Sequence, residues 1–219
     1  MSDEVQEAVK NIKGKEYQGS SIRDGVLYHD IPFDEFKNIE SHRKNNLQRW
    51  NLIKSYVSFT GKTVIDLGSS VGAMSLLAAN DYAKSVVGYD QDNHSLDVAR
   101  LIAAKLKLTN VKFIQQKIDL DFIKGIEKVD IIVCMSIFMW LRKMYGPDMA
   151  NEILKEISRK ASVMIFETAC ERDGQAPIAG LKQNQVKDFL LKPNTLYKHI
   201  SDLGTVPGWH ERHVFLCRN

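Results

Sequence analysis

A short apolar run that ends in an acidic residue and a glycine turn is the pattern in this chain that predicts chemistry most directly. Residues 64–67 read Val-Ile-Asp-Leu, and an apolar helical pattern follows the turn. The turn consists of Gly68, Ser69, Ser70, Val71 and Gly72. Gly68 lets the backbone leave the strand where a side chain would collide with a ligand, and Gly72 lets the next helix approach the sheet closely. The pattern therefore predicts a small-molecule site beside Asp66.

A second carboxylate stands at the spacing expected for a nucleoside. The segment 85–89 reads as a strand and ends before Asp90, 22 residues after Gly68. An acidic side chain at this place accepts both hydroxyl groups of an adenosine ribose. The turn lacks the middle glycine that opens the backbone to a pyrophosphate, which disfavours nicotinamide and flavin dinucleotides and favours S-adenosylmethionine (SAM). The alternative is an ordinary α/β turn with two incidental aspartates.

Length and composition limit the class of protein. The 219 residues suit one domain, and 44% hydrophobic and 26% charged residues are typical of a globular protein. No apolar run reaches the roughly 20 residues of a membrane span, and the first residues lack a secretory signal. The three cysteines are few and widely spaced, which predicts neither a disulfide framework nor a metal site. We therefore expect a cytoplasmic protein.

Strand and helix patterns alternate along most of the chain. The region 1–58 reads as a helical cover, with an amphipathic helix at its start, an irregular stretch over 14–33 and a helix from Ser41 to about Val57. The region 59–219 reads as a Rossmann-like core of the same single domain. Its predicted strands are 63–67, 85–89, 111–115, 129–135, 162–167 and 212–218, and its predicted helices are 71–79, 93–107, 120–126, 147–159, 182–192 and 194–202. This alternation predicts an α/β fold with a mostly parallel sheet.

The carboxyl ends of the predicted strands gather the polar residues. They are Asp66–Ser70, Asp90, Ile118-Asp119, Met135-Ser136 and Glu167. Ligands bind at this edge of open α/β sheets, so we expect these residues to meet in one crevice. The densest basic run, His42-Arg43-Lys44, is expected on the same helix as Arg49, where a solvated face is the alternative to a binding surface. A net charge of +3 gives only weak support for a polyanionic partner.

From about residue 47 to residue 170 the chain resembles the class I SAM-dependent methyltransferases. Three segments give a closer resemblance to the methyltransferase domain of the bifunctional methyltransferase/kinases that terminate bacterial O-antigen chains. They are Lys117-Ile118-Asp119, Cys134-Met135-Ser136-Ile137-Phe138 and Ile165-Phe166-Glu167-Thr168-Ala169. Met139 and Trp140 stand where that family has two histidines, and the kinase domain has no counterpart here. The tRNA wobble-uridine carboxymethyltransferases share parts of the pattern, but Met139 replaces their tyrosine.

The resemblance implies a role for each matching residue. Asp66, Gly68, Ser69 and Ser70 would hold the methionine part of SAM, and Gly72 would belong to the same cofactor site. Asp90 and Gln91 would hold the ribose, Ile118 and Asp119 the adenine, and Met135 would contact the sulfonium or the far face of the adenine. Arg49, with its guanidinium offered to the methionine carboxylate, Tyr17 and Gln18 would complete the site. Ordinary core packing is the alternative for Ile118 and Met135. A surface salt bridge is the alternative for Arg49, and capping of the fold is the alternative for Tyr17.

The methyl acceptor is less well defined by the sequence. Methyl transfer needs a base only if the acceptor must lose a proton, and the candidates are Glu167, His210 and His213. Arg142, with Lys143 and Arg172, could instead orient an anionic acceptor. We expect O-methylation of a sugar or sugar phosphate of a surface polysaccharide, so the expected partner is a glycan or phosphorylated glycan. A tRNA methyltransferase and a non-catalytic SAM-binding subunit are the alternatives.

Overall fold

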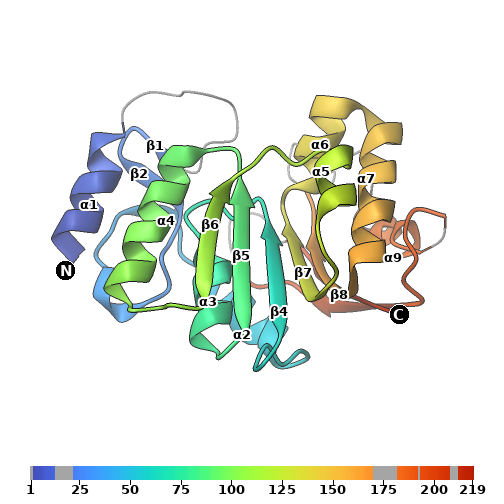
Figure 1. The fold of residues 1–219 in the computed structure, drawn as a ribbon, viewed down its shortest axis with the longest axis horizontal. Helices are drawn as coiled ribbons and strands as arrows, with labels where there is room; N and C mark the ends of the chain where they lie inside the picture. Colours follow the sequence, from blue (N-terminus) through green and yellow to red (C-terminus); the bar gives the residue numbers. More distant parts are fainter. Residues whose placement is uncertain (1, 13–21, 170–181, 192, 208–211) are drawn as a thin grey trace.

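A seven-stranded sheet runs through the middle of the molecule (Figure 1). The computed structural model describes residues 2–12, 22–169, 182–191, 193–207 and 212–219. In spatial order the strands are β6 (Val111–Gln115), β5 (Ser85–Asp90), β4 (Thr63–Leu67), β7 (Val129–Met135), β8 (Ala161–Glu167), β10 (Val214–Arg218) and β9 (His199–Gly204). The first five are parallel, and β10 runs antiparallel to both β8 and β9. The predicted α/β class with a mostly parallel sheet is confirmed.

The chain order of the strands reverses between β4 and β7. From β4 the chain builds outward through β5 to β6, and it then returns to the other side of β4 to build β7 and β8. The connection after β4 therefore leads to a strand on one side of β4, and the connection after β6 leads to a strand on its other side. Open α/β sheets bind ligands at such a reversal, beyond the carboxyl ends of the strands. The fold alone therefore predicts a ligand site at the carboxyl ends of β4 and β7.

Helices cover both faces because the central strands are apolar on both. On one face Ile132 and Cys134 pack with α5, α6 and α7, and on the other Ile131 and Val133 pack with α2 and α3. The helices are α2 (Asn46–Lys54), α3 (Ala73–Asn80), α4 (Asn93–Lys105), α5 (Leu120–Gly125), α6 (Phe138–Tyr145) and α7 (Pro147–Lys160). α6 was not predicted, because its eight residues follow β7 with no recognised start signal.

The N-terminal cover is not purely helical. After α1 (Ser2–Asn11) the strands β1 (Ile22–Arg23), β2 (Val26–His29) and β3 (Ser41–Arg43) form a small sheet, and a 3-10 helix over Asp34–Phe36 lies between β2 and β3. The prediction of a helix from Ser41 was therefore wrong. The helix begins at Asn46, and Ser41–Arg43 pairs with β2 instead. The stretch 14–33, predicted to be irregular, contains β1 and β2, and its residues 14–21 lie outside the described residues. α1 and the small sheet pack on α4 through a separate apolar cluster.

The C-terminal region also departs from the prediction. Only a 3-10 helix over Gln183–Gln185 and α9 (Val186–Phe189) occur where 182–192 was expected to be helical. The predicted helix over 194–202 is wrong, because His199–Gly204 pairs with β10 as an edge strand. Pairing with a distant strand therefore overrides the local helical spacing.

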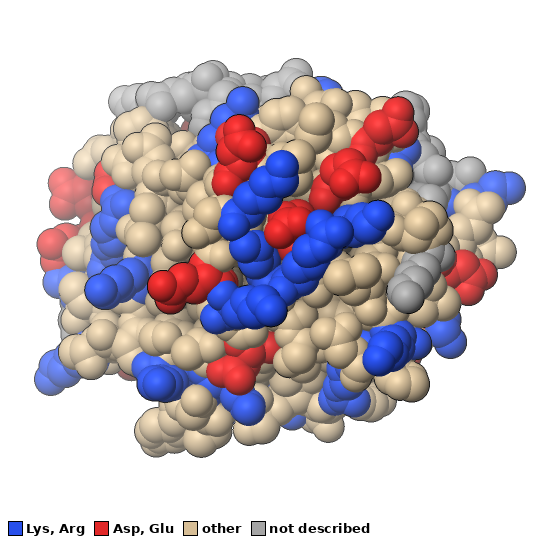
Figure 2. Space-filling model, turned by 45° about the vertical axis from the view of Figure 1, so that its right-hand side comes forward, with Lys and Arg blue, Asp and Glu red and all other residues tan. Residues whose placement is uncertain are grey.

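The surface carries both signs of charge. In the view of Figure 2 a band of Lys and Arg side chains is bordered by Asp and Glu side chains. Among the described residues, no helix has the length and apolar character that crossing a bilayer requires.

Candidate functional site

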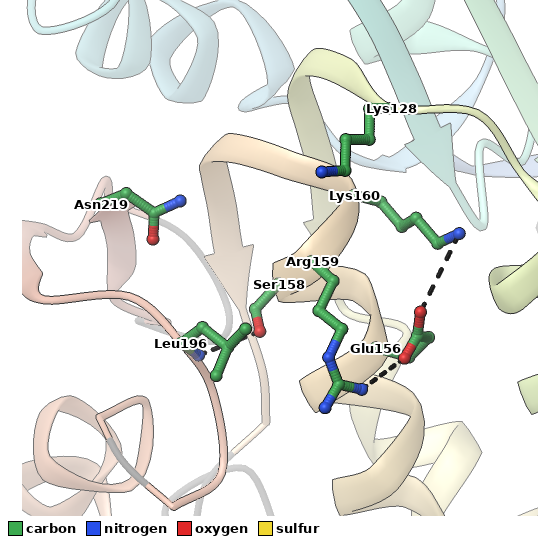
Figure 3. Close-up of a pocket in the computed structure, with 7 residues that line it drawn as sticks. All are labelled: Lys128, Glu156, Ser158, Arg159, Lys160, Leu196 and Asn219. Carbon is green, nitrogen blue, oxygen red and sulfur yellow. Dashed lines mark hydrogen bonds and ion pairs between the residues drawn. The ribbon is translucent and has the colours of Figure 1, made fainter.

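A pocket of about 420 Å³ lies at the amino-terminal edge of the sheet, away from the predicted site (Figure 3). Four of its polar side chains, those of Glu156, Ser158, Arg159 and Lys160, are engaged with one another or with the backbone. Arg159 Nη1 donates to Glu156 Oε2, Lys160 Nζ donates to two carbonyl oxygens, and Ser158 Oγ accepts from the backbone of Leu196. These contacts make the pocket part of the packing of α7. The residues of the predicted site lie at the opposite edge of the sheet, where the parallel strands have their carboxyl ends.

The turn after β4 has the backbone conformation that its glycines predict. Gly68 and Gly72 have φ angles of 75° and 81°, in the left-handed region that side chains disfavour. The N–H groups of Gly68 and Ser69 both donate to the carbonyl oxygen of Tyr89, at 2.8 and 2.9 Å. A Cβ atom on Gly72 would lie 2.6 Å from Phe113 Cζ. The turn is therefore fixed against β5 and brings α3 close to the sheet.

Asp90 holds the turn from the end of β5. Its Oδ2 accepts from the backbone N–H of Ser70 at 2.8 Å, and its Oδ1 accepts from that of Asp92 at 2.9 Å. Ser70 also has a positive φ, 57°, which the bond to Asp90 helps to maintain. Each carboxylate oxygen has two lone pairs, so Asp90 keeps acceptor capacity for hydroxyl groups of a ligand. The geometry fits the expected ribose contact, which stays a prediction.

Asp66 is buried beneath this turn. Its Oδ2 accepts a 2.7 Å hydrogen bond from Ser75 Oγ in α3. Burial raises the pKa of Asp66 to about 6, and the nearby negative charge of Asp90 acts in the same direction. Ser69 lies alongside, and its buried Oγ has no hydrogen-bond partner among the described residues. A ligand with a cationic group would stabilise the ionised form of Asp66.

The expected adenine side is formed by well-fixed residues. Ile118 is buried in the main apolar cluster, and its carbonyl oxygen accepts from Tyr145 Oη at 3.2 Å. Asp119 caps α5, because its Oδ1 accepts from the backbone N–H of Phe122 at 2.9 Å. The side chain of Gln91 is exposed, and Met135 is half-buried at the end of β7. These four residues share the carboxyl edge of the sheet with Asp90.

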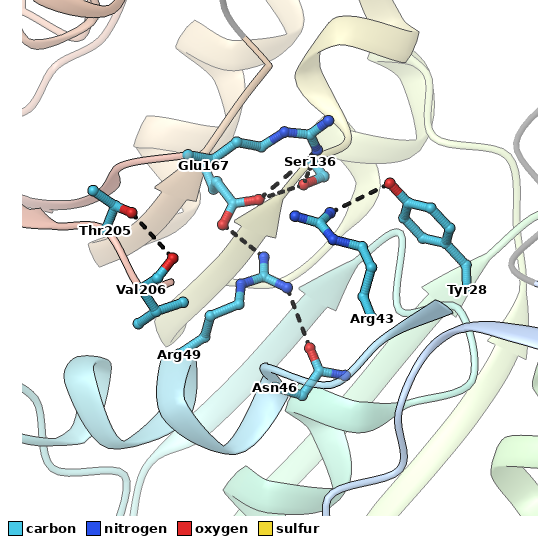
Figure 4. Close-up of polar contacts among 9 residues, drawn as sticks. Tyr28, Arg43, Asn46, Arg49, Ser136, Glu167, Thr205 and Val206 are labelled. Carbon is cyan, nitrogen blue, oxygen red and sulfur yellow. Dashed lines mark hydrogen bonds and ion pairs between the residues drawn. The ribbon is translucent and has the colours of Figure 1, made fainter. Parts of the chain in front are cut away.

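Glu167, the last residue of β8, binds a cluster of buried guanidinium groups (Figure 4). Arg49 Nη2 lies 2.7 Å from Glu167 Oε2, and Ser136 Oγ donates to Glu167 Oε1 at 2.5 Å. Arg212 Nη1 donates to Ser136 Oγ at 2.9 Å. Although burial alone would raise it, these two guanidinium groups and the Ser136 hydroxyl lower the pKa of Glu167 below its ordinary value. Both carboxylate oxygens of Glu167 are therefore occupied, and the residue anchors the guanidinium groups.

The N-terminal cover contributes to the same cluster. Arg49 Nη1 donates to Asn46 Oδ1 at 3.2 Å, and Asn46 Nδ2 donates to the carbonyl oxygen of Asp30 at 2.8 Å. The third buried guanidinium, that of Arg43, points into the cluster from β3 and donates to Tyr28 Oη at 3.3 Å (Figure 4). The cover therefore brings polar side chains of β2, β3 and α2 over the ends of β7 and β8.

The other residues predicted to deprotonate or orient the methyl acceptor have different contacts. His213 Nδ1 lies 2.8 Å from Asp202 Oδ2, a pair between the partly exposed side chains of the segment before β10 and of β9. Arg142 lies on α6, with its Cζ 5.9 Å from the centroid of the Phe138 ring. Tyr17, Gln18, His210 and Arg172 lie outside the described residues.

The residues at this edge fit the functional groups of SAM. Asp90 suits the ribose hydroxyls, Asp66 lies where a ligand ammonium would offset its charge, and Arg49 offers a cation to a carboxylate. Arg49 Nε is buried and has no hydrogen-bond partner among the described residues, as is the case for Ser69 Oγ. Buried polar atoms without a partner are rare in native proteins, and a missing ligand is one explanation for them. When bound, SAM supplies an electrophilic methyl group on a sulfonium.

The strand order, the fixed glycine turn and the carboxylate at the end of β5 define a class I methyltransferase fold. A profile of the family described as "Methyltransferase domain" matches residues 58–213, and the chain belongs to this family. Solved methyltransferases of this fold contain SAM or its demethylated product, and SAM is the cofactor of such a domain.

Three similar proteins illustrate the relationship. The bifunctional kinase-methyltransferase WbdD is 19% identical, with a TM-score of 0.77 over 98% of this chain and 46% of its own. Magnesium protoporphyrin IX methyltransferase from Synechocystis is 16% identical, with a TM-score of 0.57 over 80% of this chain and 77% of its own. Protein arginine N-methyltransferase 1 of Caenorhabditis elegans is 30% identical over 58% of this chain and 35% of its own. The chain thus spans less than half of WbdD and about a third of the curated relative.

Sequence reasoning missed part of the cluster. Arg43 was expected on a helix, and Tyr28, His29 and Arg212 were not selected as site residues. The signal that could have found Arg43 is the alternation over Ser41–Arg43, which places His42 outward and Arg43 inward. No local pattern marks the other three.

Proposed function

We propose that this enzyme O-methylates a sugar or a sugar phosphate of a surface polysaccharide. The observation that carries the proposal is the guanidinium cluster of Arg43, Arg49 and Arg212 at the carboxyl edge of the sheet. All three side chains are buried, at 6%, 7% and 6% exposure. Guanidinium groups present several N–H donors in a fixed plane, which suits oxygen-rich ligands such as phosphates and sugars.

The position of the cluster favours a role in acceptor binding. It lies where the N-terminal cover meets Ser136 and Glu167, beyond the ends of β7 and β8. The turn that suits the cofactor lies at the neighbouring ends of β4 and β5. Methyl transfer needs the acceptor oxygen and the methyl carbon held in line at about 3 Å. A donor-rich cluster beside the cofactor turn suits that task.

The whole-chain likeness to WbdD supports the same proposal. That likeness includes the N-terminal cover, since it extends over 98% of this chain, whereas the likeness to the Synechocystis enzyme extends over 80%. A shared cover suggests a shared kind of acceptor site. The face in Figure 2 gives less support to tRNA, because acidic side chains border its basic band.

A methyl-transfer assay with isotope-labelled SAM tests the proposal. The acceptors are defined oligosaccharides with a free or phosphorylated terminal sugar, and total tRNA and a protein extract serve as comparison acceptors. We expect label in the oligosaccharides. Label in tRNA or protein alone would contradict the proposal, and SAM binding without transfer to any acceptor would favour the non-catalytic subunit.

A variant pair links the assay to the cluster. Arg43→Gln should lower transfer to the oligosaccharide by 10-fold or more, because it removes one of the three positive charges of the cluster. Arg159→Gln removes an exposed guanidinium of α7 that pairs with Glu156, and it should leave transfer unchanged. Equal activities of the two variants would contradict the assignment of the cluster to the acceptor.

A further inference from the structure

We propose that His29 is a catalytic base that takes the proton of an acceptor hydroxyl. The methylated atom is then a neutral sugar oxygen and not an oxygen of a phosphate. This inference rests on the proposed function, because it chooses between the two acceptors named there.

His29 lies at the place where the acceptor is expected. It is the last residue of β2 and pairs in register with Arg43 of β3. The positive charges of Arg49, Arg43 and Arg212 all act on its ring, so the imidazole shares the guanidinium cluster. The ring packs edge-on against Tyr28, with centroids 4.7 Å apart and an interplanar angle of 83°.

The imidazole is available to accept a proton. Its Nδ1 is buried and has no hydrogen-bond partner among the described residues, although the residue as a whole is half-buried. Burial lowers the pKa of His29 well below its ordinary value, and the three guanidinium groups lower it further. The ring is therefore neutral near pH 7, the form in which a histidine acts as a base.

The other candidate bases that the structure describes are less suited to the task. Both carboxylate oxygens of Glu167 already accept hydrogen bonds, one from Arg49 and one from Ser136. His213 pairs with Asp202 at the outer strands of the sheet. A neutral imidazole inside the cluster is useful only if the acceptor brings a proton with it, because a phosphate oxygen is already ionised near pH 7. The proposed acceptor atom is therefore the oxygen of a sugar hydroxyl group.

The proposed methyl transfer forms one bond and breaks another. The acceptor oxygen forms a bond to the methyl carbon, and the bond between that carbon and sulfur breaks, with its electron pair left on sulfur. The hydroxyl proton passes to the His29 imidazole, which later releases it to water. The guanidinium groups stabilise the negative charge that develops on the oxygen.

The first experiment measures methyl transfer to a hydroxyl acceptor. His29→Asn should lower kcat by about 10²- to 10⁴-fold and leave the Kd of SAM nearly unchanged. Added imidazole should restore part of the activity of His29→Gly. His42→Asn, an exposed histidine of β3, is the matched control and should keep full activity. Full activity of His29→Asn, or transfer by the wild type to phosphorylated acceptors alone, would overturn the proposal.

The second experiment needs no acceptor. The ring carbon signals of His29, assigned by comparison with His29→Asn, are followed by NMR as pH is varied, with and without S-adenosylhomocysteine. We expect a midpoint well below pH 6.5 and a change in the signals when the compound binds. A midpoint at or above 6.5, or signals that do not respond, would overturn the proposal even if the enzyme methylates another class of acceptor. Failure of the proposed function alone would appear as no transfer to any glycan.

Discussion

Arg49 and Glu167 form a buried ion pair between two elements that are 118 residues apart in the chain. Arg49 Nη2 in α2 lies 2.7 Å from Glu167 Oε2 at the end of β8, and the side chains are only 8% and 3% exposed. The pair fixes the N-terminal cover to the sheet edge. It also neutralises one guanidinium of a cluster that contains three.

The first prediction concerns this pair. Glu167→Ala should lower the free energy of unfolding by about 3–5 kcal/mol, because it leaves the Arg49 charge buried without its partner. Asp97→Ala is the control, since the 59% exposed Asp97 pairs with Arg100 on the surface of α4, and it should cost at most about 1 kcal/mol. Urea unfolding measures both. Similar losses of unfolding free energy in the two variants would contradict a larger contribution from the buried pair.

The second prediction concerns pH and Asp66. The pKa of Asp66 is about 6 in the folded protein and 3.8 as its ordinary value, because burial disfavours the ionised form. Between these values the folded protein holds a proton that the unfolded chain releases, so the contribution of Asp66 to stability is present below pH 3.8 and is lost as pH rises through 6. The difference corresponds to about 3 kcal/mol.

Asp66→Asn isolates this contribution, because asparagine does not titrate. The free energy of unfolding of Asp66→Asn minus that of the wild type should increase by about 2.4 kcal/mol between pH 4 and pH 7. Urea unfolding at several pH values measures the difference. A difference that stays constant with pH would contradict a raised pKa for Asp66.

The third prediction concerns the ribose contact. Asp90→Ala should weaken SAM binding by about 1.5–3 kcal/mol, or roughly 10- to 150-fold in Kd, because it removes a charged acceptor for the ribose hydroxyls. Calorimetric titration measures the change. Asp97→Ala, on the surface of α4, should bind SAM as the wild type does, and an equal Kd for Asp90→Ala would remove Asp90 from the site.

The fourth prediction uses two glycines with similar backbone angles. Gly72 and Gly61 have φ angles of 81° and 72°, so alanine is strained at both. A Cβ on Gly72 would lie 2.6 Å from Phe113 Cζ, whereas a Cβ on Gly61 meets nothing within 4 Å. Gly72→Ala should therefore be less stable than Gly61→Ala by about 1–3 kcal/mol, which thermal unfolding would reveal. Equal losses would mean that Phe113 moves aside freely.

The sequence predicts the parts of this fold that depend on local pattern. The turn at Gly68 and the carboxylate at Asp90 follow from their spacing, and the five parallel strands follow from apolar runs bounded by turns. The exceptions depend on partners far away in the chain. Arg43 lies in a strand because β2 pairs with it, and 199–204 is extended because β10 pairs with it. The convergence of His29, Arg49 and Arg212 on one place has no local signal.

The roles of the cofactor residues, the division into a cover over 1–58 and a core over 59–219, and a cytoplasmic location remain predictions. The first two concern the carboxyl edge of the sheet and the cover above it. One structure with a bound ligand would test the contacts at this edge together.

The most direct test of this account is a crystal structure of the enzyme with S-adenosylhomocysteine. The account predicts that the ribose hydroxyls bond to Asp90, that the amino acid part lies along the turn over Gly68–Ser70, and that the sulfur atom faces the guanidinium cluster. Adenosine bound at another edge of the sheet, or a sulfur atom directed away from that cluster, would contradict it.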